Sequence, residues 1–221
     1  MLSFLVLSVL LSADAGVEVA PAPRRIIAIV PLGKVEQPML EAMAKALRAR
    51  VDADIRFDPV RPLPKEAFYK PRNRWRAEKL LDALDAAPPE NAWKVVAVTE
   101  SEISTTKGDI FDWGIAGLGN INGRSCVLTL YLYRKHTRTP GDVARRLADI
   151  TVHEFGHTLG LDHCPMVACV MRDAKGNAIK LADTSSGQYC GRCRAKVADG
   201  VLLPVPPLPL DPKPAASPPG R

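Results

Sequence analysis

The sequence predicts an α/β protein built around a mixed β-sheet, and two observations carry this prediction. Short β-branched runs alternate with amphipathic helical segments over the first hundred residues. Two apolar runs then flank Asn122-Gly123, and a long amphipathic segment follows them. Alternating strands and helices are typical of a parallel sheet, whereas Asn-Gly between apolar runs indicates an antiparallel hairpin. The sheet should therefore contain strands of both directions.

The first half of the chain contains the alternating elements. The helical segments have apolar residues three and four apart, which gives each helix one apolar face. The strand segments are β-branched or alternate apolar with polar residues. We expect strands at 26–30, 53–57 and 93–98, and helices at 36–50 and 73–86.

The second half contains the hairpin and the longest helix. Strands are expected at 113–118 and 125–133, around a turn at 120–123. A helix is expected at 141–160, because a stripe of residues four apart would face the core: Leu147, Thr151, Phe155 and Leu159. Regular patterns fade after this helix, so residues 161–200 should form a small subdomain that depends on local constraints.

The two ends of the chain differ from the middle. Residues 2–11 are an apolar run too short to span a bilayer, and small residues follow at 13–15. We therefore expect a signal peptide over 1–15, export to the periplasm or the cell exterior, and no stable membrane insertion after cleavage. A cytoplasmic protein is the alternative. The proline-rich residues 201–221 predict an extended, disordered tail.

The composition limits the possible functions. A hydrophobic content of 47% suits a packed core, and a net charge of +6 is too mild for a dedicated nucleic-acid binder. We expect one domain over 16–200 and no nucleic-acid partner. The sequence leaves the oligomeric state open.

Three of the four histidines lie within HEFGHTLGLDH, residues 153–163. His153 and His157 are four residues apart on the predicted helix, so at about 100° per residue both imidazoles lie on one face. Gly160 can adopt a positive φ and end the helix, which turns the chain so that His163 reaches the same ion. Three protein ligands leave a fourth zinc position open, as in catalytic sites.

Glu154 follows the first histidine and should project near that open position without binding the ion. Zinc lowers the pKa of a bound water to about 7. Glu154 can then accept a proton as general base and pass it to a leaving amine. A zinc-bound water and a general base beside it are the groups that peptide-bond hydrolysis requires.

Four of the five cysteines lie in two close pairs near the end of the chain: Cys164 with Cys169, and Cys190 with Cys193. Four such thiolates suit a closed tetrahedral zinc site, and a metal would stabilise a segment with few core residues. Disulfides are the alternative in an exported protein. A thiol-redox centre at Cys190 and Cys193 is the less favoured third possibility.

The run from His153 to Cys193 resembles the archaemetzincin family, whose pattern is H-E-x-x-H-x-x-G-x-x-H-C-x4-C-x-M followed by C-x-x-C. The resemblance implies a zincin-like fold and a zinc-dependent peptidase, with Glu154 as general base. It also implies two Zn²⁺ per chain: a catalytic ion at the three histidines and a structural ion at the four cysteines. Met171 would be the methionine of the turn beneath the catalytic zinc. The gap from Met171 to Cys190 is one residue longer than in the family pattern, which a loop can accommodate.

Two other functions are compatible with these residues. A catalytically silent zinc-binding protein of the same fold is one, although it would not need Glu154. A thiol-redox protein using Cys190 and Cys193 is another, and chelators would not suppress its reactivity. For a peptidase, we expect an extended substrate at the sheet edge formed by the hairpin 113–133. Tyr189 could donate to an oxyanion, but packing is the favoured role.

Overall fold

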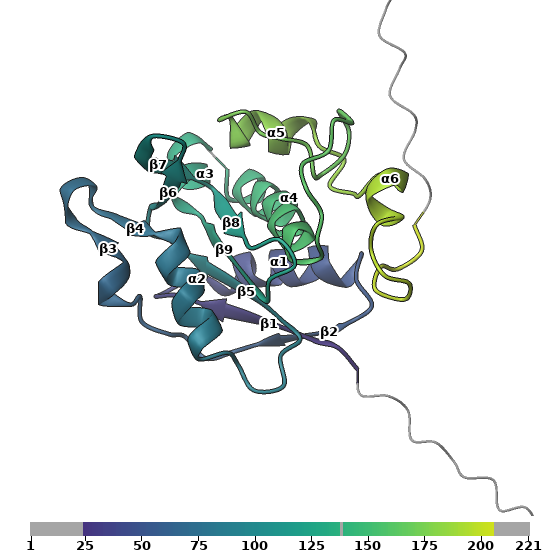
Figure 1. Cartoon of the computed structure of the whole chain (residues 1–221), viewed down its shortest axis with the longest axis horizontal. Helices are drawn as coiled ribbons and strands as arrows, with labels where there is room; N and C mark the ends of the chain where they lie inside the picture. Colours follow the sequence, from purple (N-terminus) through teal and green to yellow (C-terminus); the bar gives the residue numbers. More distant parts are fainter. Residues whose placement is uncertain (1–23, 138, 206–221) are drawn as a thin grey trace, which may run out of the picture.

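In the computed structural model, residues 24–137 and 139–205 are described, and they contain the expected mixed sheet (Figure 1). Four strands run parallel, namely β2 (Asp54–Phe57), β1 (Ile26–Pro31), β5 (Lys94–Thr99) and β9 (Ser125–Thr129), in that spatial order. The strand β8 (Gly117–Gly119) completes the edge and pairs antiparallel with β9. The α/β class and the mixed sheet are therefore confirmed.

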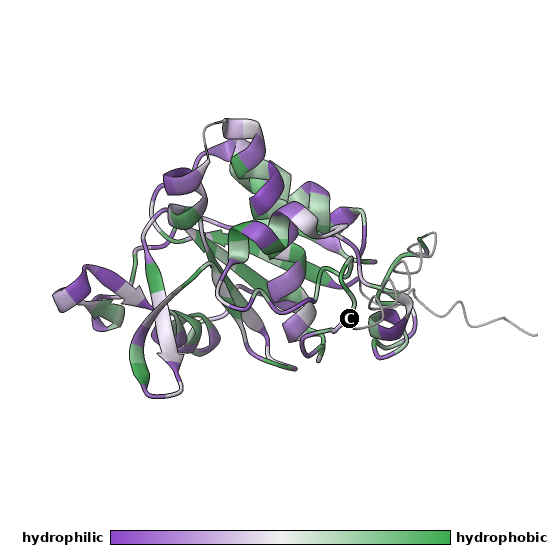
Figure 2. Cartoon of the chain, turned by 90° about the horizontal axis from the view of Figure 1, so that it is seen from above, coloured by the Kyte–Doolittle hydropathy of each residue, from purple (hydrophilic) through white to green (hydrophobic). Residues whose placement is uncertain are grey.

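Helices cover both faces of this sheet. The helices α1 (Gln37–Arg48) and α4 (Pro140–Thr158) pack together on one face, and α2 (Ala77–Ala86) covers the other. Successive side chains of a strand point to opposite faces, so Ile27 joins the α1–α4 core and Ala28 joins the α2 core. The strands between the helices are accordingly hydrophobic along most of their length (Figure 2).

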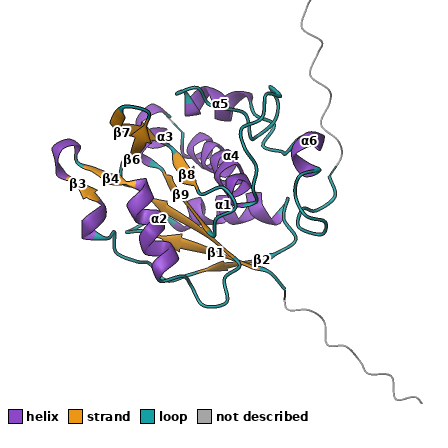
Figure 3. Cartoon of the chain, in the orientation of Figure 1, coloured by secondary structure: helices purple, strands orange, loops and turns teal. Residues whose placement is uncertain are grey.

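A second, four-stranded sheet was not expected from the sequence. Its order is β3 (Phe68–Tyr69), β4 (Arg74–Arg76), β6 (Ile103–Lys107) and β7 (Ile110–Ile115), and it lies on the side of the molecule away from α6 (Gly191–Arg194) (Figure 3). Short 3-10 helices at Lys65–Ala67 and Lys70–Arg72 flank β3.

The prediction of a helix over 73–86 was wrong at its start. Residues 74–76 form β4, which pairs parallel with β6 by matching Trp75 with Ile103, and the helix begins only at Ala77. The partner strand is distant in sequence, so a local pattern could not reveal this pairing.

The predicted hairpin is present, but its strands are shorter than expected. The segment 113–118 is divided between β7 and β8, and the second strand ends at Thr129. The short helix α3 (Tyr131–His136) then begins, with the Tyr131 N–H donating to Oγ1 of Thr129 at 3.0 Å. The β8–β9 register matches Leu118 with Val127 across the Asn-Gly turn.

The long helix α4 agrees with the prediction to within two residues at each end. Thr139 caps it by accepting a hydrogen bond from the Asp142 N–H at 3.2 Å. Leu147, Thr151 and Phe155 are fully buried, as the stripe predicted, whereas Leu159 lies just past the end of the helix and is half-buried against the same core. From Ile150 to Thr158 every residue is buried, so the histidine-bearing end of α4 lies inside the protein.

The segment after α4 contains two short helices that the sequence did not predict, α5 (Ala178–Thr184) and α6. The prediction of a disordered tail over 201–221 was wrong at its start, because Leu202 pairs with Val51 and the Leu203 N–H donates to the Arg50 carbonyl at 2.9 Å. The predicted signal peptide over 1–15 and the tail beyond 205 lie outside the described residues. Within the described ranges, no helix is both long and apolar enough to cross a membrane.

Candidate metal centre and active-site cleft

The structure brings the three predicted histidines together. His153 and His157 lie on the buried end of α4, and His163 lies in the loop after it. Their possible ligand atoms all lie within 4.8 Å of one another. The three ring centroids are 4.9, 5.4 and 5.1 Å apart. One ion placed between the rings could reach a nitrogen of each.

Gly160 makes the turn that places His163. Its φ is +87°, in the left-handed region that favours glycine. The Gly160 N–H donates to the His157 carbonyl at 2.9 Å, and the Leu161 N–H donates to the Gly156 carbonyl at 3.1 Å, which ends α4. A Cβ at position 160 would lie 2.3 Å from Oδ1 of Asn122. The turn at Gly160 was predicted from the sequence, but its contact with Asn122 was not.

Hydrogen bonds orient two of the imidazoles for metal binding. Nδ1 of His153 lies 2.7 Å from the Val170 carbonyl oxygen, and Nδ1 of His157 lies 2.7 Å from that of Leu161. A carbonyl only accepts, so Nδ1 carries the proton and Nε2 keeps its lone pair for a metal. Burial lowers the pKa of His153 to about 3 and also lowers that of His157. Neutral imidazoles are the form that binds zinc, so the donor set fits this ion.

Glu154 is buried against strand β8, where glycine leaves room for it. A Cβ at Gly117 would lie 2.6 Å from Cγ of Glu154, and one at Gly119 would lie 2.4 Å from the Glu154 main-chain oxygen. Burial raises the pKa of Glu154 to about 8, and a hydrogen bond with the Gly119 main chain partly opposes this. A bound dication nearby would favour the carboxylate.

His153, Glu154 and His163 open into one cleft of about 380 Å³. One wall is the chain from Gly114 to Leu118, which includes most of the sheet edge β8, and α5 contributes Ala178 and Leu181. The cleft therefore joins the metal centre, the buried carboxylate and an edge strand.

Met171 and Tyr189 pack against α4 at Gly156, the residue before His157. Met171 is fully buried, and a Cβ at Gly156 would lie 2.4 Å from its Sδ and 2.9 Å from Cε1 of Tyr189. The Tyr189 hydroxyl donates to the Val152 carbonyl at 2.7 Å. Tyr189 thus supports α4 from within the core, in agreement with the packing role.

The four clustered cysteines are buried, and their sulfur atoms lie within 4.8 Å of one another. The Sγ atoms of Cys164 and Cys190 are 3.7 Å apart, and those of Cys169 and Cys193 are 3.8 Å apart. Tetrahedral coordination with Zn–S bonds of about 2.3 Å places sulfur atoms about 3.8 Å apart. A disulfide requires about 2.05 Å. The geometry therefore fits a tetrahedral metal, and all five cysteines are free thiols.

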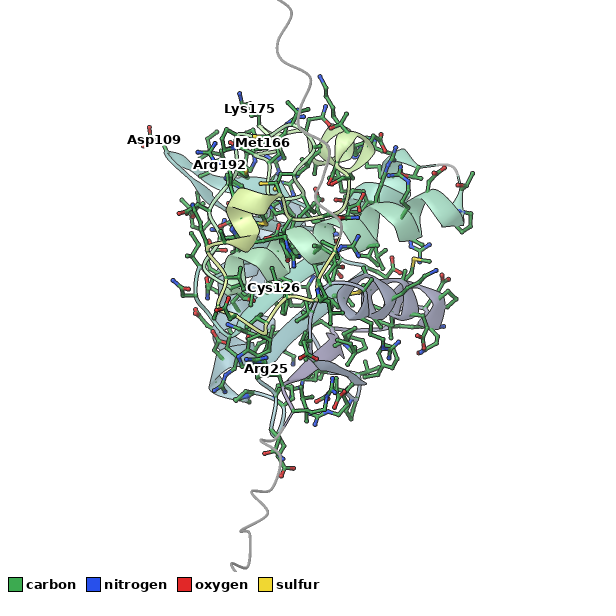
Figure 4. The ribbon with its side chains drawn as sticks, turned by 90° about the vertical axis from the view of Figure 1, so that its right-hand side faces the viewer. Arg25, Asp109, Cys126, Met166, Lys175 and Arg192 are labelled. Atoms are coloured by element: carbon green, nitrogen blue, oxygen red, sulfur yellow. The ribbon has the colours of Figure 1, made fainter. Side chains whose placement is uncertain are left out.

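The fifth cysteine, Cys126, belongs to strand β9 and is fully buried. In Figure 4 it lies in the middle of the molecule, apart from Met166 and Arg192, which belong to the two segments that carry the cluster. It is not part of the group of four cysteines that could hold a metal.

The cysteine cluster and the histidine site share one loop. Cys164 directly follows His163, and its N–H donates to the Met171 carbonyl at 2.8 Å. The Val170 N–H donates to the Gln188 carbonyl at 2.9 Å, while the Val170 carbonyl contacts His153. A metal at the cysteines would therefore hold the loop that completes the histidine site.

Sequence reasoning missed the glycines that bring β8 and the methionine loop against α4. A signal was available, because Gly117-Leu118-Gly119 suggests close backbone approach at a strand, and Gly156 is an isolated glycine within a helix. It also missed the carbonyls of Val170 and Leu161, whose main-chain positions have no sequence signature.

An α/β fold with two histidines on the buried end of a helix and a third in the loop after it, beside a glutamate in a cleft at the sheet edge, fits the zinc metallopeptidase class. A family model described as Peptidase family M54 matches residues 62–199, and the chain belongs to this family. It is 26% identical over 176 residues to the archaemetzincin of Natronomonas pharaonis, covering 76% of this chain and 97% of that one. Its identity to the archaemetzincin of Halobacterium salinarum is 27% over 178 residues, with the same coverage.

Solved archaemetzincin structures share the fold. The crystal structure from Archaeoglobus fulgidus, in complex with malonate, has a TM-score of 0.64 and 25% identity, and the match covers 78% of this chain and 99% of that one. The structure from Methanopyrus kandleri also has a TM-score of 0.64, at 24% identity, over 78% and 92% of the two chains. The archaemetzincin resemblance is therefore confirmed.

Proposed function

We propose that this metallopeptidase hydrolyses peptide bonds with Glu154 as general base, at a zinc ion held by His153, His157 and His163. The observation that carries the proposal is the shared cleft, into which Glu154 opens next to two of the histidines. Zinc, when bound, supplies a Lewis acid that activates water and polarises the scissile carbonyl. Glu154 takes up the proton from the attacking water and delivers it to the leaving amine.

An extended peptide is the substrate form that suits the cleft. The wall from Gly114 to Leu118 ends in β8, the last strand of its sheet, whose only strand partner among the described residues is β9. A peptide laid along such an edge binds through main-chain hydrogen bonds, so its backbone is held with little dependence on sequence. This supports the hairpin as the substrate-binding edge.

The proposal includes two zinc ions per chain, with the second at Cys164, Cys169, Cys190 and Cys193. The near-tetrahedral sulfur spacing supports it. Burial of Cys190 and Cys193 within this cluster argues against a thiol-redox function, which requires an accessible thiolate. Export by the signal peptide 1–15 also remains a proposal, with a cytoplasmic location as its alternative.

A peptide-library assay tests the proposed activity. The full chain is expected to cleave unstructured peptides, to lose cleavage when a chelator removes zinc from the histidines, and to regain it when zinc is added back. The new ends, identified by mass spectrometry, would show which bonds are cut. A protein with both sites loaded with zinc that cleaves none of the library would favour the silent binding protein.

A further inference from the structure

The C-terminal end of α4 is held by a lysine from the central sheet. Lys94 is the first residue of β5 and is half-buried. Its Nζ donates to the Thr158 carbonyl at 2.6 Å and to the Gly123 carbonyl at 2.6 Å. One ammonium group thus joins three elements: the central strand, the end of the metal-binding helix and the β8–β9 turn.

The same turn contacts the neighbouring carbonyl of α4. The Asn122 N–H donates to the His157 carbonyl at 3.0 Å, and Asn122 also lies against Gly160. The last carbonyls of a helix have no partners within the helix, and a cation there also interacts favourably with the helix dipole. Lys94 therefore satisfies the Thr158 carbonyl, and Asn122 donates to the His157 carbonyl together with Gly160, at the point where the chain leaves His157 to reach His163.

We infer that Lys94 is a positioning residue for the histidine metal site. It fixes the end of α4 against β5 and the β8–β9 turn, and so sets the place of His157 and the direction of the turn to His163. This inference rests on the proposed zinc binding by the histidines. Removing the ammonium group leaves the Thr158 and Gly123 carbonyls without their donor, and the histidine site loses its fixed geometry. The cysteine cluster would hold its metal through its own four sulfur atoms, so its metal affinity should change little.

The test compares metal affinity at the two sites of the same full-length chain. Cobalt replaces zinc, because cobalt–thiolate absorption reports the cysteine site and the weaker ligand-field bands report the histidine site. Chelator titration then gives the affinity of each site. Lys94→Met is expected to weaken the histidine site by about 10-fold, in the range for residues that support metal ligands, and to change the cysteine site by less than about twofold. Lys94→Arg, which keeps a cationic donor, should restore most of the affinity.

Lys79→Met is the matched control, because Lys79 also donates to a main-chain carbonyl, that of Glu66 at 3.0 Å, but lies on α2 across the sheet. It should change neither site. Equal affinities in wild type and Lys94→Met, or an equal loss at both sites, would overturn the inference. If Lys94→Met does not fold, the same titration is made on Lys94→Gln and Lys94→Arg. The inference then requires that the histidine site binds metal more weakly in Lys94→Gln than in Lys94→Arg. A wild-type chain whose histidines bind no metal would overturn both this inference and the proposed function.

Discussion

Replacing Glu154 by glutamine (Glu154→Gln) is expected to lower peptide hydrolysis by roughly 10³-fold and to leave the zinc content unchanged. Glutamine has nearly the same shape, so it fits against Gly117 and Gly119 where the carboxylate lies. It cannot accept a proton, so attack by water and departure of the amine both lose their proton carrier. The metal ligands are untouched. The measurement is kcat/KM on a library-derived peptide, together with zinc per chain.

The control for this variant is Glu90→Gln, the same chemical change at an exposed residue in the turn before β5. It should cleave like the wild type. Equal cleavage by Glu154→Gln and wild type, with full zinc occupancy, would show that Glu154 is not the general base. Loss of zinc from Glu154→Gln would instead show that this carboxylate supports the metal site.

Removing one clustered sulfur, in Cys169→Ser, is expected to cost one zinc per chain and to reduce hydrolysis by about 10-fold or more. Cys169 is fully buried, and a serine hydroxyl is a poor zinc ligand in its place. Without this metal, the loop from Cys164 to Met171 loses its anchor. The same loop carries the Val170 carbonyl that orients His153, so the histidine site should weaken as well.

Cys126→Ser is the matched control, because Cys126 is equally buried but lies on β9 outside the cluster. It is expected to keep its full zinc content, with only the stability cost of a buried hydroxyl. Retention of wild-type zinc content by Cys169→Ser would contradict the structural site. So would the finding of two disulfides in place of four thiolates in the wild-type protein.

The histidine site could be predicted from sequence because its geometry is local. His153 and His157 belong to one helix, and Gly160 and His163 follow within six residues, so helical periodicity and one turn fix their relation. The two cysteine pairs could be predicted as a site for the same reason, because each pair lies on a short segment. The long helix was predicted well because its stripe of Leu147, Thr151 and Phe155 repeats over several turns.

The missed features depend on contacts between distant segments. Strand β4 forms because it pairs with β6, and the charged residues Arg74 and Arg76 in it do not resemble a strand pattern. The close approach of β8 to Glu154 depends on Gly117 and Gly119, whose role appears only when the sheet edge meets α4. Lys94 is one of many lysines in the sequence, and only the fold brings its ammonium group to the end of α4.

The measurement that tests the central claim most directly is the number of zinc atoms per chain in the full-length protein, purified without added metal or chelator. Elemental analysis is expected to give about two, one for the histidine site and one for the tetrahedral cysteine site. A value of one or less, in protein whose four clustered cysteines titrate as free thiols, would contradict the two-site structure on which the proposed chemistry depends.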